Sequence, residues 1–242
     1  MVNSATLLEA TGLSRAFGGI HAVENVSFAI APGEVTGVIG PNGAGKTTLF
    51  NLLSGVDRAD SGRVAFRGQR VDGLSATRVN RMGIGRTFQS VRVFGDMTVR
   101  ENLRIADLNG AHAGMPGAPA RIAEALQFVD MAPHVDANAG LLSYGQRKLV
   151  ELAMVLVQEP KLILLDEPVA GVNPVLVEKI GSILSRLAQR GQTLLVVEHN
   201  IPFVTKLCRR VIVMANGGIL AQGSAAEIQS DARVLEAFLG EQ

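Results

Sequence analysis

The sequence predicts an α/β fold: a mainly parallel core sheet with an antiparallel β flank and an inserted α-helical lobe. In the second half of the chain, short apolar runs alternate with helix-like stretches, a pattern typical of a parallel sheet covered by helices. The front of the chain has more strand-like runs and fewer helices, which indicates the antiparallel flank. From about Thr98 to Gly140 the pattern is helical without a strand-like run, which predicts the lobe.

The predicted strands are short runs of apolar and β-branched residues bounded by turn signals. They are Leu7–Leu13, Val26–Ile30, Val35–Ile39, Arg63–Phe66, Leu162–Asp166, Thr193–Glu198, Val211–Ala215 and Gly218–Ala221. Asn216-Gly217 is typical of a tight hairpin turn, so we expect the last two strands to be antiparallel.

The predicted helices carry apolar residues at helical spacing. They are Lys46–Ser54, Thr98–Asp107, Arg121–Val129, Tyr144–Gln158, Pro174–Gln189 and Ala232–Leu239. The stretch Asn109–Ala120 is rich in Gly, Pro and other small residues, which predicts a loop. We expect one domain over residues 1–242, with a core formed by 1–89 and 159–242 and a helical part over about 90–158.

Composition limits the classes of function. Of the 242 residues 47% are hydrophobic, enough for a sizeable core, and 23 Lys+Arg against 22 Asp+Glu give no electrostatic reason for nucleic-acid binding. The single cysteine, Cys208, excludes an internal disulfide and a cysteine-built metal cage. We expect no targeting segment, and no apolar run approaches the ~20 residues that span a bilayer, so any membrane role requires a partner.

Residues 40–47 read GPNGAGKT and match the phosphate-loop pattern G-x-x-x-x-G-K-[ST], between a predicted strand and a predicted helix. Backbone amides of such a loop and the helix N-terminus surround phosphates, which predicts a nucleotide as ligand but does not separate kinases, GTPases and motors. Lys46 is expected to reach the β- and γ-phosphates, and the Thr47 hydroxyl to bind Mg²⁺. The expected nucleotide contacts are Gly40, Pro41, Asn42, Gly43, Ala44, Gly45, Lys46, Thr47 and Thr48.

Two acids follow the apolar run Leu162–Leu165, at the carboxyl end of a predicted strand, where open α/β sheets bind ligands. Asp166 is expected to hold Mg²⁺, directly or through water, and Glu167 to act as the general base for the attacking water. A strand that simply ends in two solvated acids is the alternative, and the phosphate loop upstream favours the catalytic interpretation.

Residues 142–146 read LSYGQ, at the start of a predicted helix and shortly before Asp166. This resembles the signature motif, usually LSGGQ, of ABC transporter ATPases, and with the other motifs the resemblance covers essentially the whole chain. It implies a P-loop NTPase (RecA-like) core with a helical subdomain and ATP hydrolysis. In this family the signature grips the γ-phosphate bound by the opposite subunit, so the implied contacts are Ser143, Tyr144, Gly145 and Gln146.

Three further residues stand where this family has functional side chains. Gln89, in RTFQ, resembles the Q-loop glutamine, which senses Mg²⁺ and the membrane partner, and His199, in VVEHN, resembles the switch histidine that contacts the γ-phosphate. Phe17 resembles the aromatic residue that stacks on adenine. Taken singly, a core phenylalanine, a structural histidine or an ordinary glutamine would explain each, but their order among the other motifs favours the functional roles.

Two departures from the family pattern narrow the resemblance. Tyr144 replaces the second signature glycine, and Asn173, in AGVNP, stands where many members have the D-loop aspartate. With GRTFQ and the ending EAFLGEQ, these features are similar to the ATP-binding subunits of branched-chain amino acid importers. The resemblance implies a homodimer or a heterodimer with a related ATPase subunit, membrane permease subunits, indirectly a solute-binding protein, no nucleic acid, and a cytoplasmic location on the inner face of the cell membrane.

The resemblance also implies that the segment Ser90–Thr98, after Gln89, receives a short permease helix. There, Phe94 and Met97 either contact the permease or pack the core of the helical lobe. Urea or amide importers and lipopolysaccharide-type exporters remain alternatives for the transport system. Soluble ABC ATPases of DNA maintenance or translation usually have a long insertion or two cassettes, and GTPases need an N-K-x-D motif, which this sequence lacks.

Overall fold

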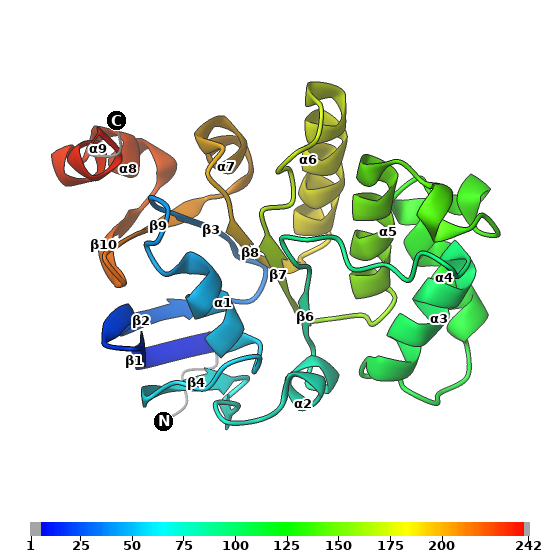
Figure 1. Ribbon diagram of the computed structural model, residues 1–242, viewed down its shortest axis with the longest axis horizontal. Coiled ribbons are helices and arrows are strands. Elements are labelled where there is room, and N and C mark those ends of the chain that lie inside the picture. The colour runs from blue at the N-terminus through cyan, green and yellow to red at the C-terminus, as the bar shows by residue number, and fades with distance from the viewer. Residues whose placement is uncertain (1–5, 240–242) are drawn as a thin grey trace.

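The computed structural model describes residues 6–239 and is built around two β-sheets (Figure 1). The strands are β1 (Leu8–Phe17), β2 (Ile20–Ile30), β3 (Val35–Ile39), β4 (Ser61–Phe66), β5 (Gln69–Arg70), β6 (Ile84–Arg86), β7 (Leu162–Asp166), β8 (Thr193–Val197), β9 (Arg210–Ala215) and β10 (Gly218–Gly223). The α-helices are α1 (Lys46–Leu53), α2 (Ala76–Arg81), α3 (Val99–Asn109), α4 (Ala118–Phe128), α5 (Tyr144–Leu156), α6 (Pro174–Gln189), α7 (Ile201–Leu207), α8 (Ala225–Ser230) and α9 (Ala232–Leu239).

The six-stranded core sheet has the order β10-β9-β3-β8-β7-β6, and its strands are parallel except for β10, which pairs antiparallel with β9. Every residue of β3, β7 and β8 is buried, as expected for strands covered on both faces. Because the strands are parallel, the loops that follow β3, β8, β7 and β6 leave the sheet at one edge. That edge carries the candidate site.

The antiparallel flank that the sequence predicts is confirmed as a four-stranded sheet of order β2-β1-β4-β5. The predicted hairpin is also confirmed: Asn216 and Gly217 have φ of 48° and 78°, as a type I′ turn needs, and they join β9 to β10. In Figure 1 the flank lies beside α1, on the side of the core sheet opposite α5.

Helices α3, α4 and α5 pack on one another and form the helical part at the right of Figure 1. Residues 98–140, all of them described, contain helices and no strand, only a single bridge between Thr98 and Asn138. One continuous hydrophobic cluster joins these helices to α6 and to one face of the core sheet. The boundaries at about residues 90 and 158 stay a prediction.

The predicted loop Asn109–Ala120 is wrong at both ends, since α3 continues to Asn109 and α4 begins at Ala118. Pro119 lies in the first turn of α4, where the missing N–H has no helical partner to lose, so proline starts the helix there. Helices α2, α7 and α8 and strands β5 and β6 were not predicted at all. Within residues 6–239, no helix is both long and apolar enough to span a bilayer.

Candidate functional site

The phosphate-loop residues connect the buried strand β3 to α1. Gly45 is the N-cap of α1 and has a left-handed backbone, with φ of 97°. A Cβ at this position would lie 2.0 Å from the carbonyl oxygen of Ala22, so only glycine fits. The flank sheet therefore fixes the entry of the chain into α1, and the amides of the first helical turn point into the loop.

Lys46 is buried inside this loop, with its side chain directed back over the preceding residues. Its Nζ donates to the carbonyl oxygens of Gly40 at 2.6 Å and Pro41 at 2.8 Å. The Lys46 ammonium thus lies beside the N-terminus of α1, and the two positive groups together favour binding of an anion. Thr47, one residue on, is exposed in the same turn, where a hydroxyl can serve as a metal ligand.

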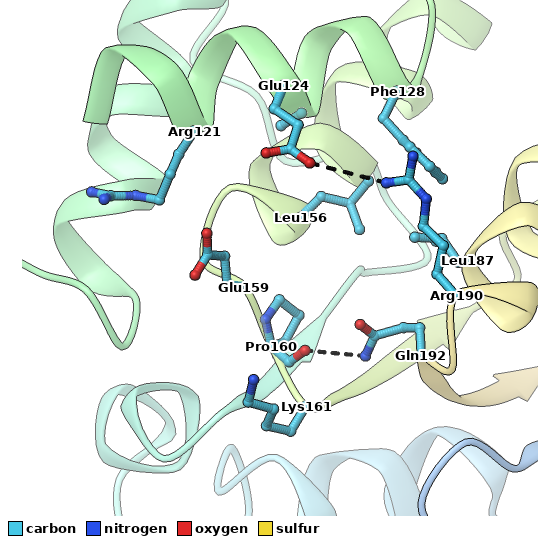
Figure 2. Close-up of a pocket in the computed structure, with 11 residues that line it drawn as sticks. Arg121, Glu124, Phe128, Leu156, Glu159, Pro160, Lys161, Leu187, Arg190 and Gln192 are labelled. Atoms are coloured by element: carbon cyan, nitrogen blue, oxygen red, sulfur yellow. Dashed lines mark hydrogen bonds and ion pairs between the residues drawn. The ribbon is translucent and has the colours of Figure 1, made fainter. Parts of the chain in front are cut away.

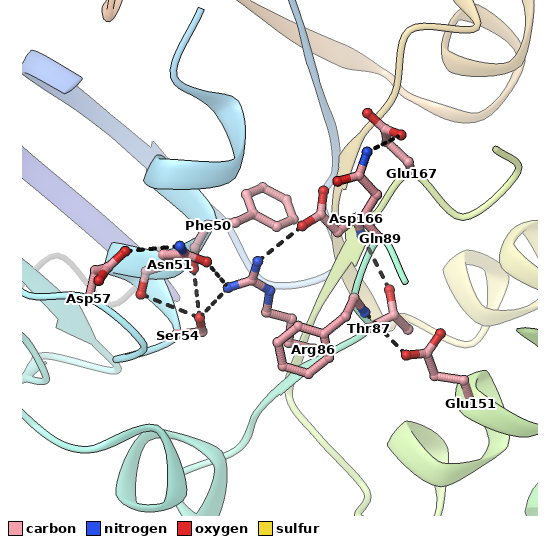
Figure 3. A network of polar contacts seen from close by, with 11 residues as sticks. Phe50, Asn51, Ser54, Asp57, Arg86, Thr87, Gln89, Glu151, Asp166 and Glu167 are labelled. Atoms are coloured by element: carbon pink, nitrogen blue, oxygen red, sulfur yellow. Dashed lines mark hydrogen bonds and ion pairs between the residues drawn. The ribbon is translucent and has the colours of Figure 1, made fainter. Parts of the chain in front are cut away.

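The three residues expected to catalyse hydrolysis come together at the carboxyl edge of the core sheet. Glu167 follows β7, His199 follows β8, and Gln89 follows β6. Gln89 Nε2 donates to Glu167 Oε2 at 3.1 Å, as Figure 3 shows, and His199 Nδ1 lies 3.8 Å from Glu167 Oε1. Glu167 is half-buried between two exposed side chains, so its carboxylate is held in place and still reaches the surface.

The backbone of Glu167 is left-handed, with φ of 48°, which is uncommon for a residue other than glycine. Its amide donates to the carbonyl of Val197 at 2.9 Å, and its own carbonyl accepts Nζ of Lys148 at 2.8 Å and the amide of Ala170 at 3.2 Å. Such a conformation persists only where the surroundings determine it, and it is common at functional sites.

Asp166 forms a buried ion pair that the sequence analysis missed. Arg86 Nη2 lies 3.0 Å from Asp166 Oδ2, and Arg86 Nη1 donates to Asn51 Oδ1 and Ser54 Oγ, both at 2.8 Å (Figure 3). The two charged side chains are 6% and 2% exposed. Burial lowers the pKa of Arg86 and raises that of Asp166, and their mutual attraction opposes both shifts.

The other carboxylate oxygen of Asp166, Oδ1, is buried and has no hydrogen-bond partner. A buried acceptor of this kind fits a ligand that supplies positive charge or a donor, such as Mg²⁺ or its bound water. Within residues 6–239 no group of three or more His, Cys, Asp or Glu side chains could hold a metal alone, so a cation at Asp166 would also need hydroxyl and phosphate oxygens.

The signature residues form the beginning of α5. Ser143 is its N-cap: Ser143 Oγ accepts the amide of Gln146 at 3.3 Å, and the Ser143 amide donates to Gln146 Oε1 at 2.9 Å. At Gly145 a Cβ would lie 2.1 Å from Leu176 Cδ2, so a larger residue here would displace the Leu176 side chain of α6. Ser143 itself is exposed at the helix N-terminus, where a phosphate can be bound.

Both departures from the usual motifs have local structural reasons. The ring of Tyr144 packs over Gly171, since its Cε1 lies 3.5 Å from where a Cβ of Gly171 would be. The side chain of Asn173 caps α6, because its Oδ1 accepts the amide of Leu176 at 2.9 Å. Aspartate caps helices equally well, so asparagine here preserves the fold and removes one charge.

The signature residues line an open groove of about 880 Å³ that also includes Gly171, Asn173 and the exposed Val175. In Figure 1, β7 and β6 lie between α1 and α5, so the signature and the phosphate loop of one chain are well separated. The structure therefore does not bring the four signature residues to the chain's own phosphate loop.

Two aromatic residues of uncertain role in the sequence are exposed. Phe17 ends β1 with 44% of its surface exposed, and the guanidinium of Arg15 lies 4.5 Å from its ring centroid. Phe94, after Gln89, is 51% exposed. A pure core role is therefore wrong for both rings.

Glu198 is a further residue that the sequence analysis missed, although it directly precedes His199. It is fully buried, and its carboxylate accepts the amides of Val169 at 2.9 Å, His199 at 3.2 Å and Asn200 at 3.4 Å. Burial raises its pKa, and these amides oppose the shift. Glu198 thus ties the loop after β8 to the loop after β7.

A separate pocket of about 300 Å³ lies between α4, the end of α5 and α6 (Figure 2). Phe128, Leu156 and Leu187 form its apolar wall, and Arg190 crosses its rim toward Glu124. None of the residues expected to bind nucleotide lines this pocket, so we assign no part of the nucleotide site to it.

The carboxyl edge of the parallel sheet carries a glycine-rich loop before a helix, together with a buried aspartate and a hydrogen-bonded glutamate. These features define a P-loop nucleotide-binding enzyme. The chain belongs to the ATP-binding cassette family of ABC transporters, and it is an ATPase coupled to transport. A family model described as "ABC transporter" matches residues 23–170, and one described as "Branched-chain amino acid ATP-binding cassette transporter" matches residues 219–242. Residues 240–242 of the ending EAFLGEQ lie outside the described part.

Full-length relatives and solved structures agree with this. The chain is 36% identical to the high-affinity branched-chain amino acid transport ATP-binding protein LivG of Escherichia coli, over 98% of this chain and 99% of the relative. BraF of Pseudomonas aeruginosa is 34% identical over the same shares. A crystal structure of an ABC transporter cassette in its ADP conformation superposes with a TM-score of 0.88, at 34% identity, covering 97% of this chain and 99% of the other. A dimeric cassette bound to ADP and phosphate gives 0.79 at 25% identity, covering 90% and 99%.

Proposed function

We propose that this chain hydrolyses ATP to drive uptake of branched-chain amino acids, or related small polar substrates, through a separate permease. The observation that carries the hydrolytic part is the held carboxylate of Glu167, beside the buried Asp166 and bonded to Gln89. The substrate class is supported by the named roles of LivG and BraF and by the match of residues 219–242 to a branched-chain amino acid family.

In the proposed reaction, the amides of the phosphate loop and Lys46 bind the β- and γ-phosphates. Glu167 orients the attacking water and takes its proton, while His199, exposed beside it, reaches the γ-phosphate. Thr47, Asp166 and Gln89 would hold Mg²⁺, which supplies charge neutralisation on the phosphates. Phe17 is proposed to stack on adenine.

The proposed active assembly is a dimer in which each nucleotide lies between the phosphate loop of one subunit and the signature of the other. The separation of the two motifs in one chain supports this, as does the dimeric cassette among the related structures. Both a second copy of the chain and a related ATPase subunit fit this arrangement, as does a position on the inner face of the membrane beside the permease.

The substrate proposal predicts ATP-dependent uptake of leucine. The chain should be reconstituted in vesicles with the permease and solute-binding protein that co-purify with it, and accumulation of labelled leucine measured with ATP on the side of this subunit. The same vesicles carrying Glu167→Gln should accumulate none. Uptake of urea or an amide without leucine, or export in place of uptake, would favour the alternative transport systems.

Phe94 is the proposed contact for the permease. Its neighbour Val93 packs against the main hydrophobic cluster, whereas Phe94 faces solvent. The buried Asn102 fixes the backbone here, because its Oδ1 accepts the Phe94 amide at 2.7 Å and its Nδ2 donates to the Phe94 carbonyl at 3.1 Å. An apolar ring on a fixed backbone suits a helix-in-groove contact.

Phe94→Ala should therefore abolish co-purification with the permease while leaving the melting temperature and ATP affinity of the isolated subunit unchanged. An exposed ring loses little packing when truncated, whereas a core phenylalanine costs ~3–5 kcal/mol. Leu108→Ala, at an exposed position on α3, is the matched control and should keep the permease. A clear fall in melting temperature without selective loss of the permease would contradict the proposal.

A further inference from the structure

Helix α5 carries two charged residues that are buried one turn apart, Lys148 and Glu151, at 7% and 6% exposure. Lysine and glutamate are almost never fully buried unless they are paired or hydrogen-bonded. Neither residue is part of the reaction described above. Their hydrogen bonds, however, reach two different loops that carry catalytic residues.

Lys148 holds the loop after β7. Its Nζ donates to the carbonyl oxygen of Glu167 at 2.8 Å, and this carbonyl belongs to the residue with the left-handed backbone. Burial lowers the pKa of Lys148, and the nearby carboxylates of Glu151 and Glu198 oppose that shift, so the ammonium has compensating charges. The bond fixes the direction in which the Glu167 side chain leaves the sheet.

Glu151 holds the segment that contains Gln89. Its Oε1 accepts the amides of Phe88 and Arg92, both at 3.3 Å, so one oxygen bridges residues on either side of Gln89. The guanidinium of Arg92 lies 3.7 Å from the centroid of the Phe88 ring and closes the same segment. Figure 3 shows Glu151 facing this segment from the side opposite Asp166.

The two sets of bonds meet at one carboxylate, because Gln89 in turn donates to Glu167 Oε2. We propose that Lys148 and Glu151 are positioning residues through which α5 holds Glu167 and Gln89 in their geometry for hydrolysis. This rests on the proposed role of Glu167 as general base. Since Ser143 caps the same helix, a displacement of α5 at its signature end also displaces the two bonds to the chain's own catalytic residues.

Lys148→Met tests the first bond, since methionine keeps an unbranched apolar side chain and removes the donor. We expect kcat for ATP hydrolysis to fall about 10–100-fold, because small misplacements of a reacting group cost rates of this order. ATP affinity should stay at the wild-type value, since the phosphate loop is untouched. Lys206→Met, which removes an exposed lysine from α7, is the matched control and should change neither quantity.

Glu151→Leu tests the second set of bonds and should lower kcat by a similar factor. It should also speed hydrogen exchange of the amides in segment 88–92. Glu151→Gln should recover most of the activity lost in the leucine variant, because its amide oxygen can still accept both N–H groups. Equal losses in Glu151→Gln and Glu151→Leu would overturn the hydrogen-bonding role.

Thermal melting identifies the variants that fold. A wild-type kcat in the folded Lys148→Met and Glu151→Leu variants would overturn the proposal. Rapid hydrogen exchange of the Phe88 and Arg92 amides in the wild-type chain would also overturn it, and that measurement needs no variant. Glu167→Gln separates the positioning role of Lys148 and Glu151 from the general-base role of Glu167. If that variant is inactive while the α5 variants are fully active, only the positioning role fails, whereas an active Glu167→Gln removes the general base itself.

Discussion

Glu167→Gln should bind ATP with wild-type affinity and hydrolyse it about 10²–10⁴-fold more slowly, the usual cost of losing a general base. Glutamine keeps the size of the side chain and can still pair with Gln89, which lies 3.1 Å from Glu167 Oε2, so the fold of the site should persist. What disappears is the capacity to take a proton from water. The expected result is a chain that binds ATP and releases almost no phosphate.

The measurement is phosphate release under saturating Mg²⁺-ATP, with gel filtration in parallel. Because hydrolysis is blocked after binding, ATP-bound dimers should accumulate and elute ahead of the monomer. Glu178→Gln is a suitable control, since Glu178 is an exposed acid on α6 that forms a surface ion pair with Lys206. Near-normal phosphate release by Glu167→Gln would remove Glu167 from its proposed role, and another base would then have to be found.

The sequence could predict the core of the site because its residues lie at ends of apolar strands. The bounds of β3 and β7 agree with prediction residue for residue, since five consecutive buried residues leave no amphipathic ambiguity. Parallel pairing then brings the loops after such strands to one edge, which is why Glu167 and His199 lie within 3.8 Å of each other. Their catalytic roles stay predictions.

Short elements could not be predicted because tertiary contacts form them. Strand β6 has three residues, Ile84–Arg86, and is a strand because it pairs with β7. Helix α7 is seven residues long and depends on the Asn200 cap, and Pro202 in its first turn resembles a loop signal in the sequence. An isolated helix of this length is marginal in water, so its own residues carry little signal.

The supporting residues of the site were missed for a related reason. Lys148 and Glu151 fall in a helix pattern where charged residues normally mark the solvent-facing side. Their partners are backbone groups 19 to 63 residues away, and no local pattern encodes such a contact. Arg86 was similarly hidden, because a cation on a strand indicates a buried ion pair only once Asp166 is known to lie beside it.

The proposed dimer places each nucleotide between the phosphate loop of one subunit and the signature of the other, and this arrangement predicts a second large effect on ATP hydrolysis. Lys46→Ala should weaken ATP binding strongly, because Lys46 Nζ is the buried cation of the phosphate loop. Ser143→Arg should leave ATP binding to the isolated subunit intact and block hydrolysis, because the exposed Ser143 faces the open groove and not its own phosphate loop. Each variant alone should therefore hydrolyse almost no ATP. Lys46→Ala damages the phosphate-loop side of the site, and Ser143→Arg damages the signature side.

Mixing the two variants should restore activity. In a mixed dimer, one site combines Lys46→Ala with Ser143→Arg and the other site has neither lesion. With random pairing of a two-fold dimer, about a quarter of all sites are intact, so hydrolysis should approach that fraction of the wild-type rate. A mixture that hydrolyses ATP no faster than either pure variant would contradict complementary sites in a dimer of this chain, and the test would then be repeated with a related ATPase subunit as the partner.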